Sequence, residues 1–357
     1  MIVFVGPSPK PITGQSLAFD IISGYYNKDK KVFYYGVSSQ NLLLISWGTL
    51  CVFFSFFWFL ITHRSIKTLY LTTSRTTLGF CRDLLFVLTA KLFSIKVVNH
   101  LHGADFKDFR SRKRPWFRKF VDYVYEQIDT SIVLLPRMKD QYDIYRQMNV
   151  VSISNCALPI SDLPRKRTDY LKVLYLSNIM YSKGIFLLIE AVDSLIKSGA
   201  KVQLSIAGEP MGDEYKDKDD VQIEFERAIR NKPYVEYMGT VTGTKKDQLL
   251  IDSDVFVLPS FYKTEAQPIS IIEAMLAGSA IITTNHNYLA DMVTSNIGCV
   301  IGTRSTKEIE LSLLSLIDHP DKLNQVCRYN KSYAKKYYSL ERYVKDISIV
   351  LETHPDI

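Results

Sequence analysis

The chain has 357 residues, of which 47% are hydrophobic and 23% are charged, with a formal net charge of +7. This length predicts two domains, and the composition excludes whole-chain disorder, a collagen helix and a coiled coil. The positive charge favours anionic partners: a phosphate-rich ligand, an anionic membrane surface or nucleic acid. The five cysteines include no C-x-x-C spacing, which argues for a reducing compartment and against a disulfide framework or a zinc site.

The first part of the chain has the alternating pattern of a doubly wound parallel domain. Its β-rich apolar runs and the helical patterns between them are, in chain order, 2–5, 16–24, 32–35, 68–72, 79–93, 96–100, 115–126 and 130–135. The N-terminus shows no basic region and no cleavage site, so we expect no secretory signal and a cytoplasmic protein.

One segment of this domain has the composition of a membrane-associated helix. Residues 42–62 are uncharged, and about 20 apolar residues suffice to span a bilayer. A crossing would separate the first strand from the rest of its sheet, which argues against it. Two interpretations stay open. The segment is either a helix that packs on the domain and dips into one leaflet, flanked by cations at the headgroups, or a fully buried core helix.

A basic run at 106–120, with the sequence FKDFRSRKRPWFRKF, mixes cations with aromatic residues. It fits a solvated helix face, a nucleic-acid patch or an anionic leaflet. No nucleic-acid motif accompanies it, so we expect no nucleic-acid partner and prefer an anionic membrane surface.

The remaining chain predicts a second domain of the same class. A linker rich in proline and charge at 155–168 is followed by renewed strand and helix alternation, and 323–351 is helical without a strand. We therefore expect domains at 1–160 and 161–330. The segment 331–357 is expected to be helical and to pack back on the first domain.

The strongest motif is the stretch 259–278, which follows a buried strand and opens a helix at Pro268. The helix N-terminus then faces the crevice beyond the strand, where open α/β sheets bind ligands and phosphates. Glu265 and Glu273, eight residues apart, can grip two hydroxyl pairs of an extended ligand. The alternative is one solvated carboxylate and one on a helix surface.

Three further positions suggest phosphate or sugar binding. Lys183 starts a helix, where a cation opposes the macrodipole unless an anion binds between them, which predicts a diphosphate clamp rather than a solvated lysine. Gly14 would let the backbone approach a phosphate. His102, at the carboxyl end of a strand, points into the crevice, although a structural role is the alternative.

An Asp-Ser-Asp sequence at 252–254 resembles the D-x-D motif of metal-dependent transferases. It lies just before a buried strand, so we interpret it as structural and expect no catalytic metal.

Together these residues resemble a retaining nucleotide-sugar glycosyltransferase of the GT-B fold, family 4 (group 1) type. The matching motifs are the Ser-Lys-Gly turn at 182–184, the stretches 207–209, 237–239 and 254–260, and the E-x7-E pair. The resemblance implies two Rossmann-like doubly wound domains facing a central cleft.

The resemblance also implies residue roles. Glu273 would hold the ribose, Glu265 and His102 would lie at the donor sugar, Lys183 would bind the diphosphate and Gly14 would lie near the β-phosphate. His102, Lys183 and Glu265 are then the candidate catalytic residues. The candidate donor-binding residues are Gly14, Asn178, Lys183, Gly208, Gly239, Gln267, Pro268, Ile269 and Glu273. The family usually has Arg where this chain has Asn178, so a second phosphate cation is missing or is supplied elsewhere.

The implied function is transfer of a sugar from a nucleotide-sugar, UDP- rather than GDP-linked, to a lipid-linked or cell-surface glycan acceptor. Polysaccharide, O-antigen and capsule biosynthesis are the contexts expected, with the enzyme peripheral on the inner face of the cell membrane and without a cofactor. Two alternatives stay open: a sugar-nucleotide epimerase of the same fold, or a non-catalytic protein that binds nucleotide-sugars or nucleic acid.

Overall fold

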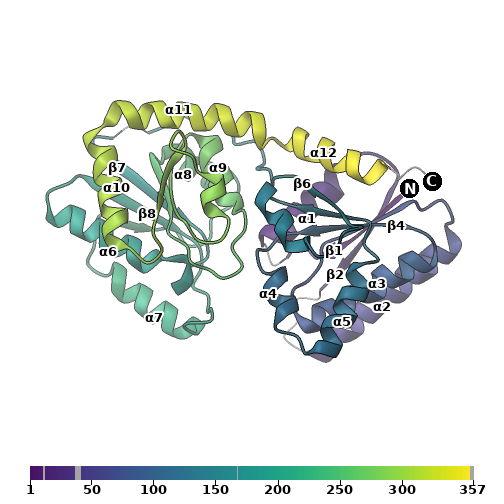
Figure 1. Ribbon diagram of the computed structural model, residues 1–357. Coiled ribbons are helices and arrows are strands. Elements are labelled where there is room, and N and C mark those ends of the chain that lie inside the picture. The colour runs from purple at the N-terminus through teal and green to yellow at the C-terminus, as the bar shows by residue number, and fades with distance from the viewer. Residues whose placement is uncertain (11–12, 37–41, 167, 354–357) are drawn as a thin grey trace. The chain divides into compact units, whose positions relative to one another are not determined.

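The computed structural model describes residues 1–10, 13–36, 42–166 and 168–353, with the side chains of 42–46 left out (Figure 1). The chain divides into two compact units. Unit 1 comprises Met1–Asn155 and Glu341–Ile357, and unit 2 comprises Cys156–Leu340. The predicted boundaries lie at 160 and 330. Residues 331–340, which were predicted to belong to the last helical segment, are part of unit 2.

Unit 1 is built on a six-stranded parallel sheet. Its strands, in spatial order, are β2 (Lys30–Tyr35), β1 (Ile2–Pro7), β3 (Thr68–Leu71), β4 (Lys96–Leu101), β5 (Thr130–Val133) and β6 (Asn149–Ser152). Its helices are α1 (Gly14–Tyr25), α2 (Leu42–Thr62), α3 (Thr77–Leu92), α4 (Phe106–Ser111), α5 (Pro115–Tyr125), the 3-10 helix η1 (Pro136–Tyr142) and α12 (Leu340–Glu352). The central strands are buried on both faces, as parallel sheets require.

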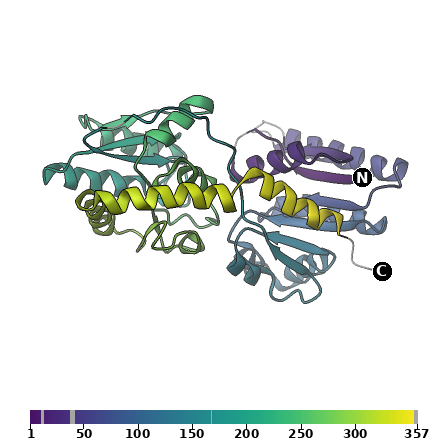
Figure 2. The ribbon, with the colours of Figure 1, turned by 90° about the horizontal axis from the view of Figure 1, so that it is seen from above.

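Helices cover both faces of this sheet because β2 lies on one side of β1 and β3 on the other, so the order in which strands are added reverses after β2. Right-handed crossovers on the two sides of β1 place their helices on opposite faces. On one face α3 lies between α2 and α5. Phe86 of α3 contacts Phe56 of α2, and Phe80 of α3 contacts Phe117 of α5. On the other face α12 runs along unit 1 (Figure 2), where Thr68 Oγ1 donates to the Leu351 carbonyl at 2.9 Å.

Helix α2 has one packed and one exposed side. Phe56 and Leu60 are buried, whereas Trp47, Phe54 and Trp58 are 69%, 63% and 67% exposed. The interpretation of 42–62 as a fully buried core helix is therefore wrong, because one side of the helix packs against β2 and α3 while the other is exposed. Among the described residues, no helix is both long enough and apolar enough to cross a membrane.

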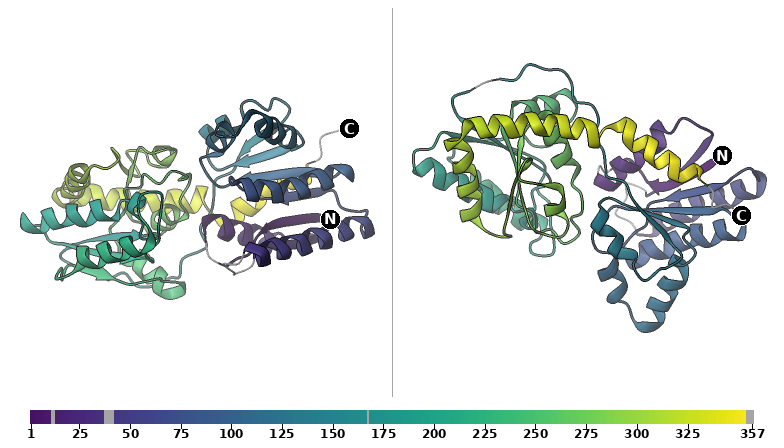
Figure 3. Two further views of the ribbon diagram at one scale, coloured as in Figure 1. Left: turned by 90° about the horizontal axis from the view of Figure 1, so that it is seen from below. Right: turned by 45° about the horizontal axis from the view of Figure 1, so that its top comes forward.

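Unit 2 repeats the design with a second parallel sheet. Its strands, in spatial order, are β12 (Gly298–Ile301), β11 (Ala280–Thr284), β10 (Val255–Leu258), β7 (Leu171–Leu176), β8 (Val202–Ala207) and β9 (Val235–Tyr237). Its helices are η2 (Tyr181–Lys183), α6 (Ile185–Lys197), α7 (Lys218–Ile229), α8 (Gly243–Asp252), α9 (Ile269–Ala277), η3 (Leu289–Met292), α10 (Thr306–Asp318) and α11 (Pro320–Tyr337). Helix α11 runs along one side of unit 2 (Figure 3). The predicted fold class, two doubly wound α/β domains, is confirmed.

Candidate active site

The structure brings Lys183 and Glu265 together at the carboxyl edge of the second sheet. Lys183 Nζ lies 2.5 Å from Glu265 Oε2, and the two side chains are only 12% and 9% exposed. Ser260 Oγ donates to the same carboxylate oxygen at 2.9 Å. A buried carboxylate is thus held by a cation and a hydroxyl, in a place where electrostatic interactions are weakly screened.

Backbone contacts between two loops bring this pair together. Gly184 has φ +75°, and a Cβ there would lie 2.2 Å from the Pro259 carbonyl oxygen, so a side chain would push the two loops apart. The Phe261 N–H donates to the Ser182 carbonyl at 2.7 Å, and the Ser182 N–H donates to Asp213 at 2.7 Å. These contacts fix the turn after β7 against the loop after β10.

The second carboxylate of the E-x7-E pair is also matched with a lysine. Lys246 Nζ, from α8, lies 2.6 Å from Glu273 Oε1 on α9. Burial raises the pKa of Glu273, and the charge and hydrogen bond of Lys246 oppose that rise. The sequence analysis missed Lys246, because its partner lies 27 residues further along the chain. Spacing carries no signal for this pair, because the two residues belong to different helices.

Along the chain, the N-terminus of α9 lies between the two carboxylates, Glu265 and Glu273. Pro268 is its N-cap and Ile269 its first residue. No side chain caps the helix and no acidic residue lies in its first turn. Gln267, just before it, is buried. The positive end of this helix dipole is therefore unbalanced by the described side chains, which favours an anion there.

Two glycines hold the neighbouring strand ends together. Gly208 has φ +144°, and a Cβ there would lie 1.9 Å from the Ser177 carbonyl oxygen. The Gly208 N–H donates to the Gly239 carbonyl at 2.9 Å. Asn178 accepts a bond from Tyr175 Oη at its backbone carbonyl, also at 2.9 Å. Asn178 and both glycines thus lie at the same edge of the sheet as Lys183.

The two remaining candidates, His102 and Gly14, lie in unit 1. Both ring nitrogens of His102 are buried and make no hydrogen bond with the described residues. The ring lies against that of His100, with centroids 4.1 Å apart and the ring planes tilted by 35°. Gly14 is the first residue of α1, and a Cβ there would meet no heavy atom within 4 Å. Because both ring nitrogens of His102 lack a partner among the described residues, the neutral ring can donate one hydrogen bond and accept another, as a sugar hydroxyl requires.

Protonation of His102 is strongly disfavoured. Burial, together with the charge of Arg75, lowers the pKa of His102 to about 3, against 6.5 for the ordinary side chain. The unfolded chain therefore binds a proton below pH 6.5 that the folded chain refuses until far lower pH. We expect the free energy of unfolding to fall as the pH drops from 7 to 4. In urea denaturation at a series of pH values, His102→Asn should reduce that dependence, while the buried His100, whose pKa is also lowered by burial, keeps its own share. An unchanged slope would contradict the expected pKa.

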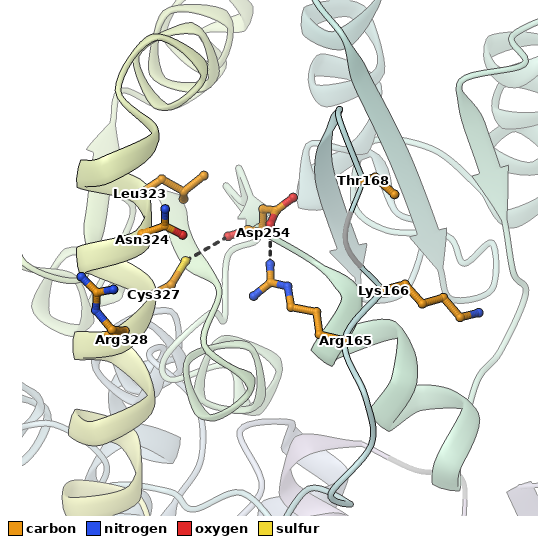
Figure 4. Close-up of a pocket in the computed structure, with 8 residues that line it drawn as sticks. All are labelled: Arg165, Lys166, Thr168, Asp254, Leu323, Asn324, Cys327 and Arg328. Carbon is orange, nitrogen blue, oxygen red and sulfur yellow. Dashed lines mark hydrogen bonds and ion pairs between the residues drawn. The ribbon is translucent and has the colours of Figure 1, made fainter.

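The Asp-Ser-Asp motif lies in unit 2, at the amino edge of the second sheet, opposite the edge that holds Lys183 and Glu265. Asp252 accepts the Lys166 N–H at 2.8 Å, and Asp254 pairs with Arg165 and accepts the Lys172 N–H at 2.8 Å. These carboxylates fasten the linker to β7 and β10. A cavity of about 410 Å³ opens there (Figure 4). Its lining residues are Arg165, Lys166, Thr168, Asp254, Leu323, Asn324, Cys327 and Arg328, none of them a predicted site residue.

Residues 160–333 match the family described as Glycosyl transferases group 1. Unit 2 carries a group 1 glycosyltransferase domain. The match covers the whole carboxyl edge described above, with both lysine–glutamate pairs.

Individual relatives are distant from this chain. Glycogen synthase of Mycobacterium tuberculosis (strain ATCC 25618 / H37Rv) is 27% identical over 157 residues, which are 44% of this chain. The matched part is only 36% of that relative, about a third of its length.

Solved structures share the complete two-domain fold. The Anabaena Alr3699/HepE structure in complex with UDP-glucose has a TM-score of 0.73 at 14% identity and covers 98% of both chains. The lipopolysaccharide outer core galactosyltransferase WaaB, in its apo form, has a TM-score of 0.64 at 15% identity and again covers 98% of both chains. At such identities the likeness establishes the GT-B fold alone.

Proposed function

We propose that the protein is a retaining glycosyltransferase of the family 4 type that moves a sugar from a nucleotide-sugar to a lipid-linked or cell-surface glycan. The observation that carries the proposal is the buried Lys183–Glu265 pair beside the N-terminus of α9, inside a group 1 domain. A cation and a helix N-terminus suit a diphosphate, and a carboxylate suits sugar hydroxyls. A UDP-sugar is the preferred donor, since HepE was solved with UDP-glucose.

The reaction needs no protein nucleophile in this proposal. The acceptor hydroxyl oxygen attacks the anomeric carbon from the face that the nucleotide leaves, while the bond from that carbon to the phosphate oxygen breaks. The hydroxyl proton passes to the departing phosphate oxygen. Lys183 and the N–H groups at the start of α9 stabilise the negative charge that grows on the phosphate. Glu265 suits hydroxyls of the donor sugar, and the neutral His102 of unit 1 can donate and accept hydrogen bonds of the same kind.

The acceptor is proposed to be presented at an anionic membrane surface, on the inner face of the cell membrane. Helix α2 exposes an apolar stripe at helical spacing, defined by Trp47, Leu50, Phe54, Phe57, Trp58 and Ile61. Helix α5, on the same face of the sheet, exposes Trp116, Lys119, Phe120 and Tyr123. Apolar and cationic groups together suit an interfacial helix on anionic lipid. WaaB, a lipopolysaccharide outer core galactosyltransferase, shares the fold and so fits this acceptor class.

A nucleotide-release assay tests the proposal. The protein is incubated with UDP- and GDP-sugars, with and without a membrane extract as the source of acceptor. Acceptor-dependent release of nucleotide supports the transferase, and EDTA should not abolish it. Conversion of the sugar without acceptor would favour an epimerase, and binding without either reaction would favour a non-catalytic role. Loss with EDTA that Mn²⁺ restores would instead point to metal-dependent transfer.

The two glutamates should separate donor binding from turnover. Glu273→Ala is expected to weaken nucleotide-sugar binding by about 1–3 kcal/mol, because one charged acceptor of ribose hydrogen bonds is lost. Glu265→Ala should depress turnover more than donor affinity. Calorimetric binding and steady-state kinetics measure the two effects. Wild-type behaviour of both variants would show that the E-x7-E pair is misassigned.

A further inference from the structure

We propose that Lys246 is a positioning residue of the donor site, which keeps Glu273 ionised and oriented so that the carboxylate can accept the ribose hydroxyls. The inference rests on the proposed function, since it takes Glu273 as the ribose ligand. It assigns a role to a residue outside the motifs of the sequence analysis.

The geometry leaves one carboxylate oxygen for the ligand. Lys246 Nζ contacts Glu273 Oε1 at 2.6 Å, and no described residue bonds to Oε2. Lys246 lies in the first half of α8 and Glu273 in the middle of α9, and the two helices pack side by side. An ion pair that bridges two helices fixes the carboxylate rotamer before a ligand arrives, so less entropy is lost on binding.

The charge balance around Glu273 makes the lysine necessary. The side chain is only 12% exposed, and burial disfavours its ionised form. The neighbouring charge of Asp247, from α8, acts in the same direction, whereas Lys246 opposes both. Lys246 is the cation that favours the ionised form of this carboxylate. A protonated Glu273 would lose one acceptor and the charge that strengthens ribose hydrogen bonds.

The two lysine–glutamate pairs are also relevant to Asn178, which stands where the family usually has an arginine. Unit 2 supplies two lysines to its carboxyl edge, Lys183 beside Glu265 and Lys246 beside Glu273. Each neutralises one glutamate of the pair eight residues apart. The diphosphate of a donor would thus enter a site in which both carboxylates are paired with lysines. This pairing reduces the electrostatic repulsion between the carboxylates and the diphosphate.

The test is the pH dependence of UDP-glucose binding, whose diphosphate has no group that titrates between pH 5.5 and 9. Wild-type affinity should be nearly flat over this range. In Lys246→Met the pKa of Glu273 rises, so the affinity should fall with decreasing pH, by about tenfold per unit below that pKa. It should return toward the wild-type value at pH 9. Lys246→Arg should restore the flat profile.

Two controls distinguish this role from a structural one. Lys245→Met removes an exposed lysine from the same turn of α8 and should leave the profile flat. Glu273→Gln cannot titrate, so adding Lys246→Met to it should introduce no pH slope. Parallel profiles for wild type and Lys246→Met, or an equal slope in the Glu273→Gln background, would overturn the inference. Absence of UDP-glucose binding by the wild type would instead overturn the proposed function.

Discussion

Replacing Lys183 by alanine is expected to lower turnover by about 10²-fold or more. In the proposed mechanism the cation lies where charge grows as the nucleotide departs, and a preorganised charge in a buried site contributes most in the transition state. Donor affinity should fall less, since in the proposed function Glu273 and the start of α9 provide much of the nucleotide binding. Steady-state kinetics with a saturating donor measure the effect.

The structure adds a consequence for stability. Lys183 and Glu265 are both largely buried, so removing the lysine leaves a carboxylate held by Ser260 without its cation. Breaking a buried ion pair in this way costs about 3–5 kcal/mol. The melting temperature of Lys183→Ala should therefore drop, and adding Glu265→Gln should recover much of it. Turnover should stay low in the double variant, because the lost phosphate contact is not restored.

A matched control lies at the other end of α6. Lys197 is 76% exposed and forms an i,i+4 pair with Asp193. Surface pairs of this kind contribute little, so Lys197→Ala should change neither turnover nor melting appreciably. Equal turnover for Lys183→Ala and Lys197→Ala would show that Lys183 does not contact the leaving group.

The central strands and the main site motif could be predicted from local pattern alone. Strands such as β7 and β10 are buried on both faces, so their sequences are short apolar runs. The edge strands β6 and β12 were missed, because each is only four residues long and buries at most one side chain. The same limit applies to α2, whose uniform composition does not reveal that only one side packs.

Site residues were predictable where the chain itself brings them close. Glu265, Pro268 and Glu273 belong to one loop and one helix, so their spacing carries the signal. Lys246 acts through a contact between two helices, 27 residues from its partner, which spacing does not encode. Arg75, which helps to keep His102 neutral, approaches it from the loop after another strand. Tertiary contacts of this kind require the fold.

Binding to anionic vesicles should depend on the basic segment of unit 1. Each cation near an anionic surface contributes about 1 kcal/mol. Changing five of them to serine should therefore release the protein from such vesicles at moderate salt, and added salt should weaken wild-type binding too. The five residues are Arg112, Lys113, Arg114, Arg118 and Lys119. Turnover on a short water-soluble acceptor should survive, because the donor site in unit 2 is unchanged.

A variant with the same change in charge provides the control. Helix α11 of unit 2 carries five exposed cations, which are Lys322, Arg328, Lys331, Lys335 and Lys336. Their replacement by serine lowers the net charge equally but leaves unit 1 intact, so vesicle binding in a co-sedimentation assay should persist. Equal losses in both variants would show that binding follows net charge rather than a defined surface.

The exposed stripe of α2 supplies the apolar half of the proposed contact. Changing Trp47, Phe54 and Trp58 to serine should abolish vesicle binding while the protein stays folded and becomes more soluble, since all three are mostly exposed. Phe56→Ser is the matched control on the buried side of α2. This ring is fully buried against Phe86, so its loss should cost about 3–5 kcal/mol of stability. If the triple variant still bound vesicles, the stripe would not face lipid. If it unfolded, α2 would belong to the core despite its exposure.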